Sequence, residues 1–352
     1  MKLGLQFDRL QKWTRDVRYD RISRRLAEPF YNAITHEQGV SPSLRKALRE
    51  AEDYARQVLG SKRFLPWLNV YTAYRGEFVP GWISDNYYGR VVLPHIQGKL
   101  TELSSSKTLS RRLLCTERLP DVGYHVNGVW YDPQWNRVDP AEVSGRLYGR
   151  EDQLYFKREN SQKGRGVMLI RRAEFRAQDF GITDNLVIQR PIQLNEFFLR
   201  FGSQSGATIR IITHKPNGTK TRIAGSYLRL GRSGIVRSAE QIHVPIIDQN
   251  GRLAAHGALS DWRKVTAHPE TNISFEGLEV PSYRTALNMC SQWHDRLPHM
   301  GIIGWDVATN AAGEIELMEW NSDHPGIKFS EASQGPCFTG FGWEHLARTN
   351  RT

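Results

Sequence analysis

Hydrophobic periodicity at the start of the chain predicts helices. Apolar residues recur near helical spacing over residues 1–30, and arginines and lysines crowd the positions between them. A second helix is predicted over residues 42–59, with Ser41 as its N-cap, Pro42 in its first turn and Gly60 as its stop signal. Residues 1–60 therefore form a helical region. The aromatic-rich stretch that follows contains short apolar runs such as residues 91–93, and we expect residues 61–120 to form a small α/β region.

From residue 121 onward the pattern changes to short extended runs. Residues 124–131 predict a hairpin over Asn127 and Gly128, the residue pair that favours a two-residue hairpin turn. Strands are predicted over residues 154–158 and 167–170, and residues 185–192 predict a buried strand that leads into a linker. These elements divide the rest of the chain into residues 121–195 and residues 196–352.

The most informative hairpin comprises residues 302–308 and 314–321, which flank a short polar turn. Glu319 and Asn321 are two positions apart and leave the same face of their strand, and Asp306 lies opposite Glu319 to within about one step. Two facing carboxylates repel each other, and apolar neighbours make their burial worse. A divalent cation removes both problems. Two acids and a carboxamide oxygen suit magnesium that is held together with a substrate phosphate.

Several basic and glycine residues are candidates for binding phosphate. Lys157 ends a strand, and Ser161, Gly164 and Gly166 follow it in a loop whose backbone N–H groups can approach phosphate oxygens. The spacing matches neither a Walker loop nor a Rossmann fingerprint. A helix predicted over residues 103–114 carries Lys107 in its first turn.

One arginine is placed where burial is costly. Arg210 lies in the apolar strand of residues 207–213, and a guanidinium there needs an anion. It is a candidate clamp for a γ-phosphate or an acyl phosphate, and Arg229 and Arg232 are weaker candidates for the same role.

The sequence G-W-D…M-E-W-N, with its Asp306, Glu319 and Asn321 spacing, resembles the metal-binding signature of the ATP-grasp superfamily, whose best-known member is D-alanine–D-alanine ligase. The residues of this motif are most similar to those of the family associated with sugar-transfer gene clusters, and the resemblance covers residues 100–330. It implies an α/β (α+β) ATP-grasp fold, in which residues 121–195 are the lid subdomain and residues 196–352 the C-terminal catalytic subdomain, an antiparallel sheet with helices.

The resemblance also implies roles for individual residues. Lys107 and Lys157 would contact ATP phosphates, and Ser161, Gly164 and Gly166 would form the lid loop. Gln189 and Ile192 would contact adenine, and Glu196 would hold the ribose hydroxyls. Asp306, Glu319 and Asn321 would bind Mg²⁺, with two ions expected, and Arg210 would clamp the transferring phosphoryl group.

The implied function is a carbon–nitrogen ligase that joins a small carboxylate to an amine through an acyl phosphate, in polysaccharide or specialised-metabolite biosynthesis. Two alternatives are open: a kinase that phosphorylates a hydroxyl, because its ATP half-site would look the same, and a non-catalytic nucleotide-binding scaffold. The intact metal triplet argues against the scaffold.

The composition bears on the class of ligand and on the cellular location of the protein. The formal charge of +11 suits small anions better than nucleic acid, since no zinc finger or RNP motif accompanies it. The basic segment of residues 1–27 is either a docking helix or a weak contact for an anionic membrane surface. The three cysteines are scattered, which favours the cytoplasm.

Overall fold

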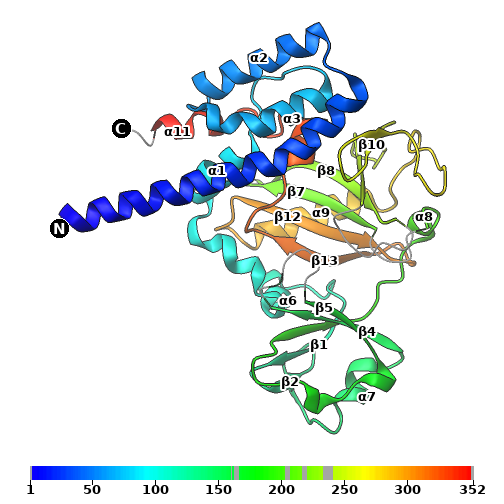
Figure 1. Ribbon diagram of the computed structural model, residues 1–352. Helices are drawn as coiled ribbons and strands as arrows, with labels where there is room; N and C mark the ends of the chain where they lie inside the picture. Colours follow the sequence, from blue (N-terminus) through cyan, green and yellow to red (C-terminus); the bar gives the residue numbers. More distant parts are fainter. Residues whose placement is uncertain are drawn as a thin grey trace.

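The computed structural model describes residues 2–159, 161, 166–202, 207–215, 220–232 and 241–349, with side chains from residue 16 to residue 347. Three parts follow one another along this chain: an N-terminal helical part, a small sheet and a large sheet (Figure 1). Among the described residues, no helix combines the length and the apolar character that crossing a membrane requires.

The N-terminal part is built from α1 (Lys2–Gln38), α2 (Pro42–Gln57) and α3 (Leu65–Arg75). The Ser41 hydroxyl accepts the backbone N–H of Leu44 at 3.1 Å, as expected of an N-cap. The N-terminal portion of α1 extends beyond the rest of the molecule, whereas its C-terminal portion packs on α3 (Figure 1).

The expected small α/β region is wrong, because residues 61–120 contain helices and no strand. After α3 come α4 (Asp85–Tyr87), a π-helical turn (Tyr88–Val92) and α5 (Leu93–Ile96), and then the 3-10 segments Gly98–Ser105 and Lys107–Leu109 and the short α6 (Ser110–Leu114). The apolar run at residues 91–93 packs among aromatic rings of α3 and α4 instead of pairing as a strand. A short apolar run does not by itself distinguish a strand from a buried helical turn. The helix predicted over residues 103–114 is likewise interrupted, at Ser106.

The small sheet has the strand order β3-β2-β1-β6-β4-β5 and lies within residues 121–189. Its strands are β1 (Asp121–Val126), β2 (Val129–Tyr131), β3 (Arg137–Val138), β4 (Gln153–Arg158), β5 (Val167–Arg171) and β6 (Leu186–Gln189), and α7 (Val143–Tyr148) packs against it. The β1–β2 turn is formed by Asn127 and Gly128, both with positive φ.

The large sheet has the order β11-β10-β9-β8-β7-β12-β13, with β13 at the edge nearest the small sheet (Figure 1). Its strands are β7 (Thr208–His214), β8 (Arg222–Leu230), β9 (Ile242–Pro245), β10 (Gly257–Ala258), β11 (Lys264–Val265), β12 (Ile302–Thr309) and β13 (Ile315–Asn321). The short α8 (Glu196–Leu199) precedes it, and α11 (Leu346–Thr349) ends the described chain.

The two faces of the large sheet are covered differently. On one face α9 (Tyr283–Asp295) packs against apolar side chains of β7 and β12, and Trp293 lies 5.7 Å from Trp305 between ring centroids. On the other face α10 (Lys328–Gln334) joins the sheet to α3, and its Phe329 contacts Tyr227. The β13 end of this second face also carries the polar groups described below.

A β-bulge sets the register of the β12–β13 hairpin. Near the turn Thr309 pairs with Ile315 and Val307 with Leu317, and that count would place Asp306 opposite Met318. The register shifts by one residue after Val307, so that Asp306 pairs with Glu319 instead. The bulge therefore brings the two acids directly across from each other.

Candidate functional site

Four strands of the large sheet bring charged side chains to one face. Asp306 on β12 pairs with Glu319 on β13 and with Arg210 on β7, and Arg210 in turn pairs with Tyr227 on β8. Directly paired residues share a face, as do residues two apart on one strand, so Asn321 lies on this face as well. The structure thus brings together four residues that the sequence singles out: Arg210, Asp306, Glu319 and Asn321.

Asp306 is held by two arginines. Arg210 donates to both of its carboxylate oxygens at 2.7 Å, and the Arg229 Nη1 donates to Oδ1 at 3.0 Å. Asp306 and Arg210 are each 6% exposed. Burial would raise the pKa of Asp306, but Arg210 and Arg229 outweigh it and hold the pKa below its usual value. Asp306 therefore remains charged in a buried position.

Glu319 is in the opposite situation. Its pKa is raised, first by desolvation among the surrounding groups and then by the Asp306 carboxylate, while Lys157, Lys107 and Arg210 act in the other direction. The side chain is nevertheless exposed to solvent. A carboxylate that is disfavoured by its surroundings and still accessible is well placed to receive a cation.

Lysines from outside the large sheet reach the same place. The pKa of Lys157 on β4 is lowered by desolvation and, more weakly, by Lys107, and it is raised by Glu319, Asp121 and Asp306. Lys107 donates from Nζ to the Ser161 carbonyl oxygen at 2.7 Å. The small sheet thus presents Lys157 to the acids of the large one.

Positive charge exceeds negative charge in this cluster. The cationic groups outnumber the carboxylates: they are Lys107, Lys157, Arg210, Arg229 and Arg111, against Asp121, Asp306 and Glu319. Such a site favours a polyanion that also brings a metal ion with it.

The oxygen donors fit magnesium in kind. Within the described ranges, no three histidine, cysteine, aspartate or glutamate side chains are grouped so that they could hold a metal ion. Asp306, Glu319 and Asn321 instead offer two carboxylates and an amide oxygen on one face, which matches the preference of Mg²⁺. The oxygens of Asp306 already accept from arginines, so Glu319 and Asn321 are the more available donors.

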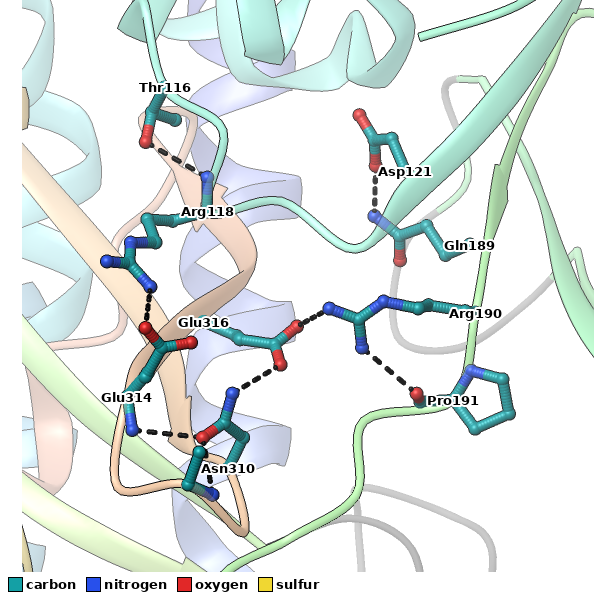
Figure 2. A network of polar contacts seen from close by, with 10 residues as sticks. Thr116, Arg118, Asp121, Gln189, Arg190, Pro191, Asn310, Glu314 and Glu316 are labelled. Carbon is teal, nitrogen blue, oxygen red and sulfur yellow. Dashed lines mark hydrogen bonds and ion pairs between the residues drawn. The ribbon is translucent and has the colours of Figure 1, made fainter. Parts of the chain in front are cut away.

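The residues expected to contact adenine and ribose lie around the end of β6 and the start of α8. The Gln189 amide nitrogen donates to Asp121 at 2.8 Å, which leaves the amide oxygen as the atom that could accept from adenine (Figure 2). Ile192 is half-buried beside the core, and Glu196 is exposed in the first turn of α8. Ser161 and Gly166 flank the lid loop, and Gly164 lies outside the described residues.

Comparison with known proteins bears on this arrangement. Residues 177–341 match the model of the sugar-transfer-associated ATP-grasp family. Over this segment, which is just under half of the chain, the protein is similar to that family. The segment contains Gln189, Arg210 and the whole β12–β13 hairpin, and the mixed helical and antiparallel architecture agrees with the α/β ATP-grasp fold expected from the sequence.

A search of curated protein sequences gave no match. Among solved structures, N5-carboxyaminoimidazole ribonucleotide synthetase from Thermotoga maritima is 10% identical, with 80% of this chain and 60% of that chain covered and a TM-score of 0.40. The D-alanine-D-alanine ligase from Coxiella burnetii is 11% identical, with 72% and 60% covered and a TM-score of 0.38. The biotin carboxylase domain of Hydrogenobacter thermophilus 2-oxoglutarate carboxylase is 12% identical, with 71% and 47% covered and a TM-score of 0.41. The chain spans 47–60% of the length of these three proteins.

Two connections join the small sheet to the turn end of the β12–β13 hairpin (Figure 2). Arg190, just after β6, donates to the Glu316 carboxylate at 2.8 Å, and Asn310 donates to the other Glu316 oxygen at 3.0 Å. Arg118, just before β1, pairs with Glu314 at 3.1 Å. The segment by which the chain enters the small sheet from α6 and the segment by which it leaves the sheet after β6 are thereby held to the hairpin that carries Asp306 and Glu319.

Replacing Arg190 with methionine should lower the free energy of unfolding by about 1–2 kcal/mol, because it leaves the Glu316 carboxylate buried with one partner fewer. We expect less than the full cost of a broken buried pair, since Arg190 itself is partly exposed. Arg118→Met is the matched control: its pair with Glu314 is exposed, and no measurable change is expected. Urea unfolding of both variants measures this, and equal losses would contradict a specific role for Glu316.

Sequence reasoning missed several groups in this region. Asp121 and Glu316 were not singled out, and Arg229 was ranked below Arg210 although both bind Asp306. A signal for Arg229 was present, because it is a second arginine in an apolar strand that follows the Arg210 strand. Arg232 pairs instead with Glu270, at 2.6 Å.

Proposed function

We propose that the protein is an ATP- and Mg²⁺-dependent ligase that joins a carboxylate to an amine through an acyl phosphate. The observation that carries the proposal is the cross-strand pair Asp306 and Glu319, with Asn321 on the same face and Lys157 beside them. The family match over residues 177–341 supports ATP as the nucleotide.

In the first step an oxygen of the substrate carboxylate attacks the γ-phosphorus of ATP, the bond to the β–γ bridging oxygen breaks, and ADP leaves. Magnesium held by Asp306, Glu319 and Asn321 would supply charge neutralisation on the phosphates. Lys157 and Lys107 would bind phosphate oxygens from the side of the small sheet. Arg210 would stabilise charge on the transferring phosphoryl group.

In the second step the amine attacks the acyl carbon, the bond to the phosphate oxygen breaks, and inorganic phosphate leaves while the nitrogen gives up a proton. Water would compete for the acyl phosphate, so the small sheet and its loop must close the site. The contacts of Arg190 and Arg118 with the hairpin fix where that closure turns. A small-molecule acid and amine are the expected substrates, and polysaccharide or specialised-metabolite synthesis in the cytoplasm is the proposed setting.

Hydroxylamine distinguishes a ligase from a kinase. With ATP, Mg²⁺ and pools of carboxylic acids, we expect a hydroxamate of one acid to accumulate together with ADP, because hydroxylamine intercepts the acyl phosphate. Mass spectrometry identifies the product. A stable phosphorylated compound that forms without any amine would instead indicate phosphoryl transfer to a hydroxyl.

Removal of magnesium should weaken ATP binding by about tenfold or more, because the acids of the hairpin and the triphosphate repel each other until a cation bridges them. Calorimetric titration of ATP in Mg²⁺ and in EDTA measures the difference. Equal affinity in both buffers would mean that the hairpin does not contribute a metal site.

A further inference from the structure

One row of the large sheet contains three buried polar atoms without partners. Thr208 on β7 pairs with Arg229 on β8, and Arg229 pairs with His243 on β9. The Thr208 Oγ1, the Arg229 Nε and the His243 Nδ1 are all buried, and none has a hydrogen-bond partner among the described residues. The three side chains leave the same face of neighbouring strands, so they are direct neighbours.

This row lies next to the row of directly paired residues described above, Tyr227, Arg210, Asp306 and Glu319. Thr208 is two residues from Arg210, and Arg229 is two residues from Tyr227, so both rows share one face. Arg229 also connects the rows, because its Nη1 binds Asp306 at 3.0 Å and its Nη2 lies 3.4 Å from the Tyr227 hydroxyl. Of its three side-chain nitrogens, Nε alone has no hydrogen-bond partner among the described residues.

An unsatisfied buried polar atom costs about 1–3 kcal/mol, so a ligand that paired all three atoms of this row would relieve that cost. The Arg229 Nε can only donate, and the Thr208 hydroxyl can donate. The pKa of His243 is lowered to about 3, by burial and then by Arg229 and Arg210, so the ring is neutral at pH 7. Its Nδ1 can therefore carry the proton and donate too.

Two aromatic rings hold the His243 ring in position. It packs against Tyr227 at 5.0 Å and against Phe329 of α10 at 5.3 Å between ring centroids. The charged groups that face the ring are Arg229, Arg210 and Asp306. Three donors, one of them on the Arg229 guanidinium, with Arg210 as a second guanidinium nearby, match an oxyanion better than a cation or a neutral hydroxyl.

We propose that Thr208, Arg229 and His243 bind a carboxylate of the acid substrate, one strand step from the Arg210–Asp306 pair. This rests on the proposed ligase function for the identity of the anion, since a phosphate oxygen has the same hydrogen-bonding chemistry. The row would hold the acid beside the site of phosphoryl transfer, and its three donors would replace the hydration that the carboxylate loses.

Acetate and inorganic phosphate serve as probes, titrated into the protein without ATP or magnesium and followed through the ring resonances of His243. Thr208→Val keeps the shape of the side chain and removes its hydroxyl. We expect it to weaken acetate binding by about tenfold, the effect of losing one hydrogen bond to a charged group. Without acetate the variant should be at least as stable as the wild type, because an unpaired buried hydroxyl has become a methyl group.

Thr72→Val is the matched control, since Thr72 is fully buried in α3 and its hydroxyl donates to the Leu68 carbonyl oxygen at 2.8 Å. Acetate affinity should be unchanged in that variant. Equal acetate affinity in Thr208→Val and wild type, or no saturable acetate binding at all, would overturn the proposal. Binding of phosphate but not of acetate would overturn the carboxylate assignment.

The two proposals fail separately. If acetate binds through Thr208 and calorimetry detects no Mg²⁺-ATP binding, the oxyanion row stands and the ligase function falls. If Mg²⁺-ATP binds and acetate does not, the ligase function survives and the row is only a set of unsatisfied atoms.

Discussion

A Glu319→Gln variant should fold as the wild type does and should lose ATP-dependent turnover by a factor of about a hundred or more. The amide nitrogen has no lone pair for magnesium, and a preorganised electrostatic group of this kind contributes about 3 kcal/mol to lowering a barrier. Turnover is measured with the acid identified by hydroxylamine trapping. Glu314→Gln is the control from the same hairpin, because Glu314 is exposed in the turn and pairs with Arg118.

The stability of this variant is a second readout. The pKa of Glu319 is raised in the folded protein, so the contribution of this one group to stability is most favourable when it is protonated and is lost as pH rises through the raised pKa. The glutamine cannot ionise and escapes that loss. Glu319→Gln should therefore equal or exceed the wild type in stability at neutral pH without metal. Turnover within tenfold of wild type in the folded variant would remove the main support for the metal site.

The acidic hairpin was predictable from sequence because its information is local. Strand propensity, a polar turn and residue spacing place Asp306 close to Glu319, and pairing of the two strands needs no distant part of the chain. The final step of register was not predictable, since it depends on the bulge between Asp306 and Val307. The residue pattern carries no signal for that extra residue in the pairing.

The arginines on Asp306 depend on distant contacts. Arg210 and Asp306 are 96 residues apart, and their register follows from the pairing of β7 with β12. The position of Arg210 in an apolar strand predicts an anionic partner, and a phosphate was the expected one. The structure supplies a protein carboxylate as a partner instead. A buried arginine needs negative charge, but its sequence does not say which group provides it.

The N-terminal part shows the limit of pattern reasoning. The α2 helix has a cap, a regular apolar stripe and a stop residue, and it was predicted within about two residues of its ends. Residues 61–120 have none of these signals in regular order. Their short helical turns are held by aromatic side chains packed on α3 and α10, so tertiary contacts decide a conformation that local preference leaves open.

The two facing acids should differ sharply in what their neutralisation does to the fold. Asp306→Asn should lower the free energy of unfolding by about 3–5 kcal/mol, because it leaves the buried guanidinium of Arg210 and its neighbour Arg229 without their carboxylate. The amide nitrogen of the introduced asparagine would also face the N–H groups of Arg210 and Arg229, donor against donor. Glu319→Gln has no such cost, and this contrast separates a charge that the fold requires from one that only the chemistry requires.

The pH dependence of the Asp306 contribution can be derived from its lowered pKa. A carboxyl with a lowered pKa stabilises the fold above its ordinary value of 3.8, and that contribution is lost as pH falls through the lowered value. The gap between wild type and Asp306→Asn should therefore be widest at neutral pH and should narrow in acid. Urea unfolding at several pH values measures it, with Asp261→Asn as the control because its pair with Arg263 is exposed and should be worth less than about 1 kcal/mol. A loss below about 1 kcal/mol in Asp306→Asn at neutral pH would mean that Arg210 and Arg229 do not depend on this carboxylate, and that Asp306 is as free to bind metal as Glu319.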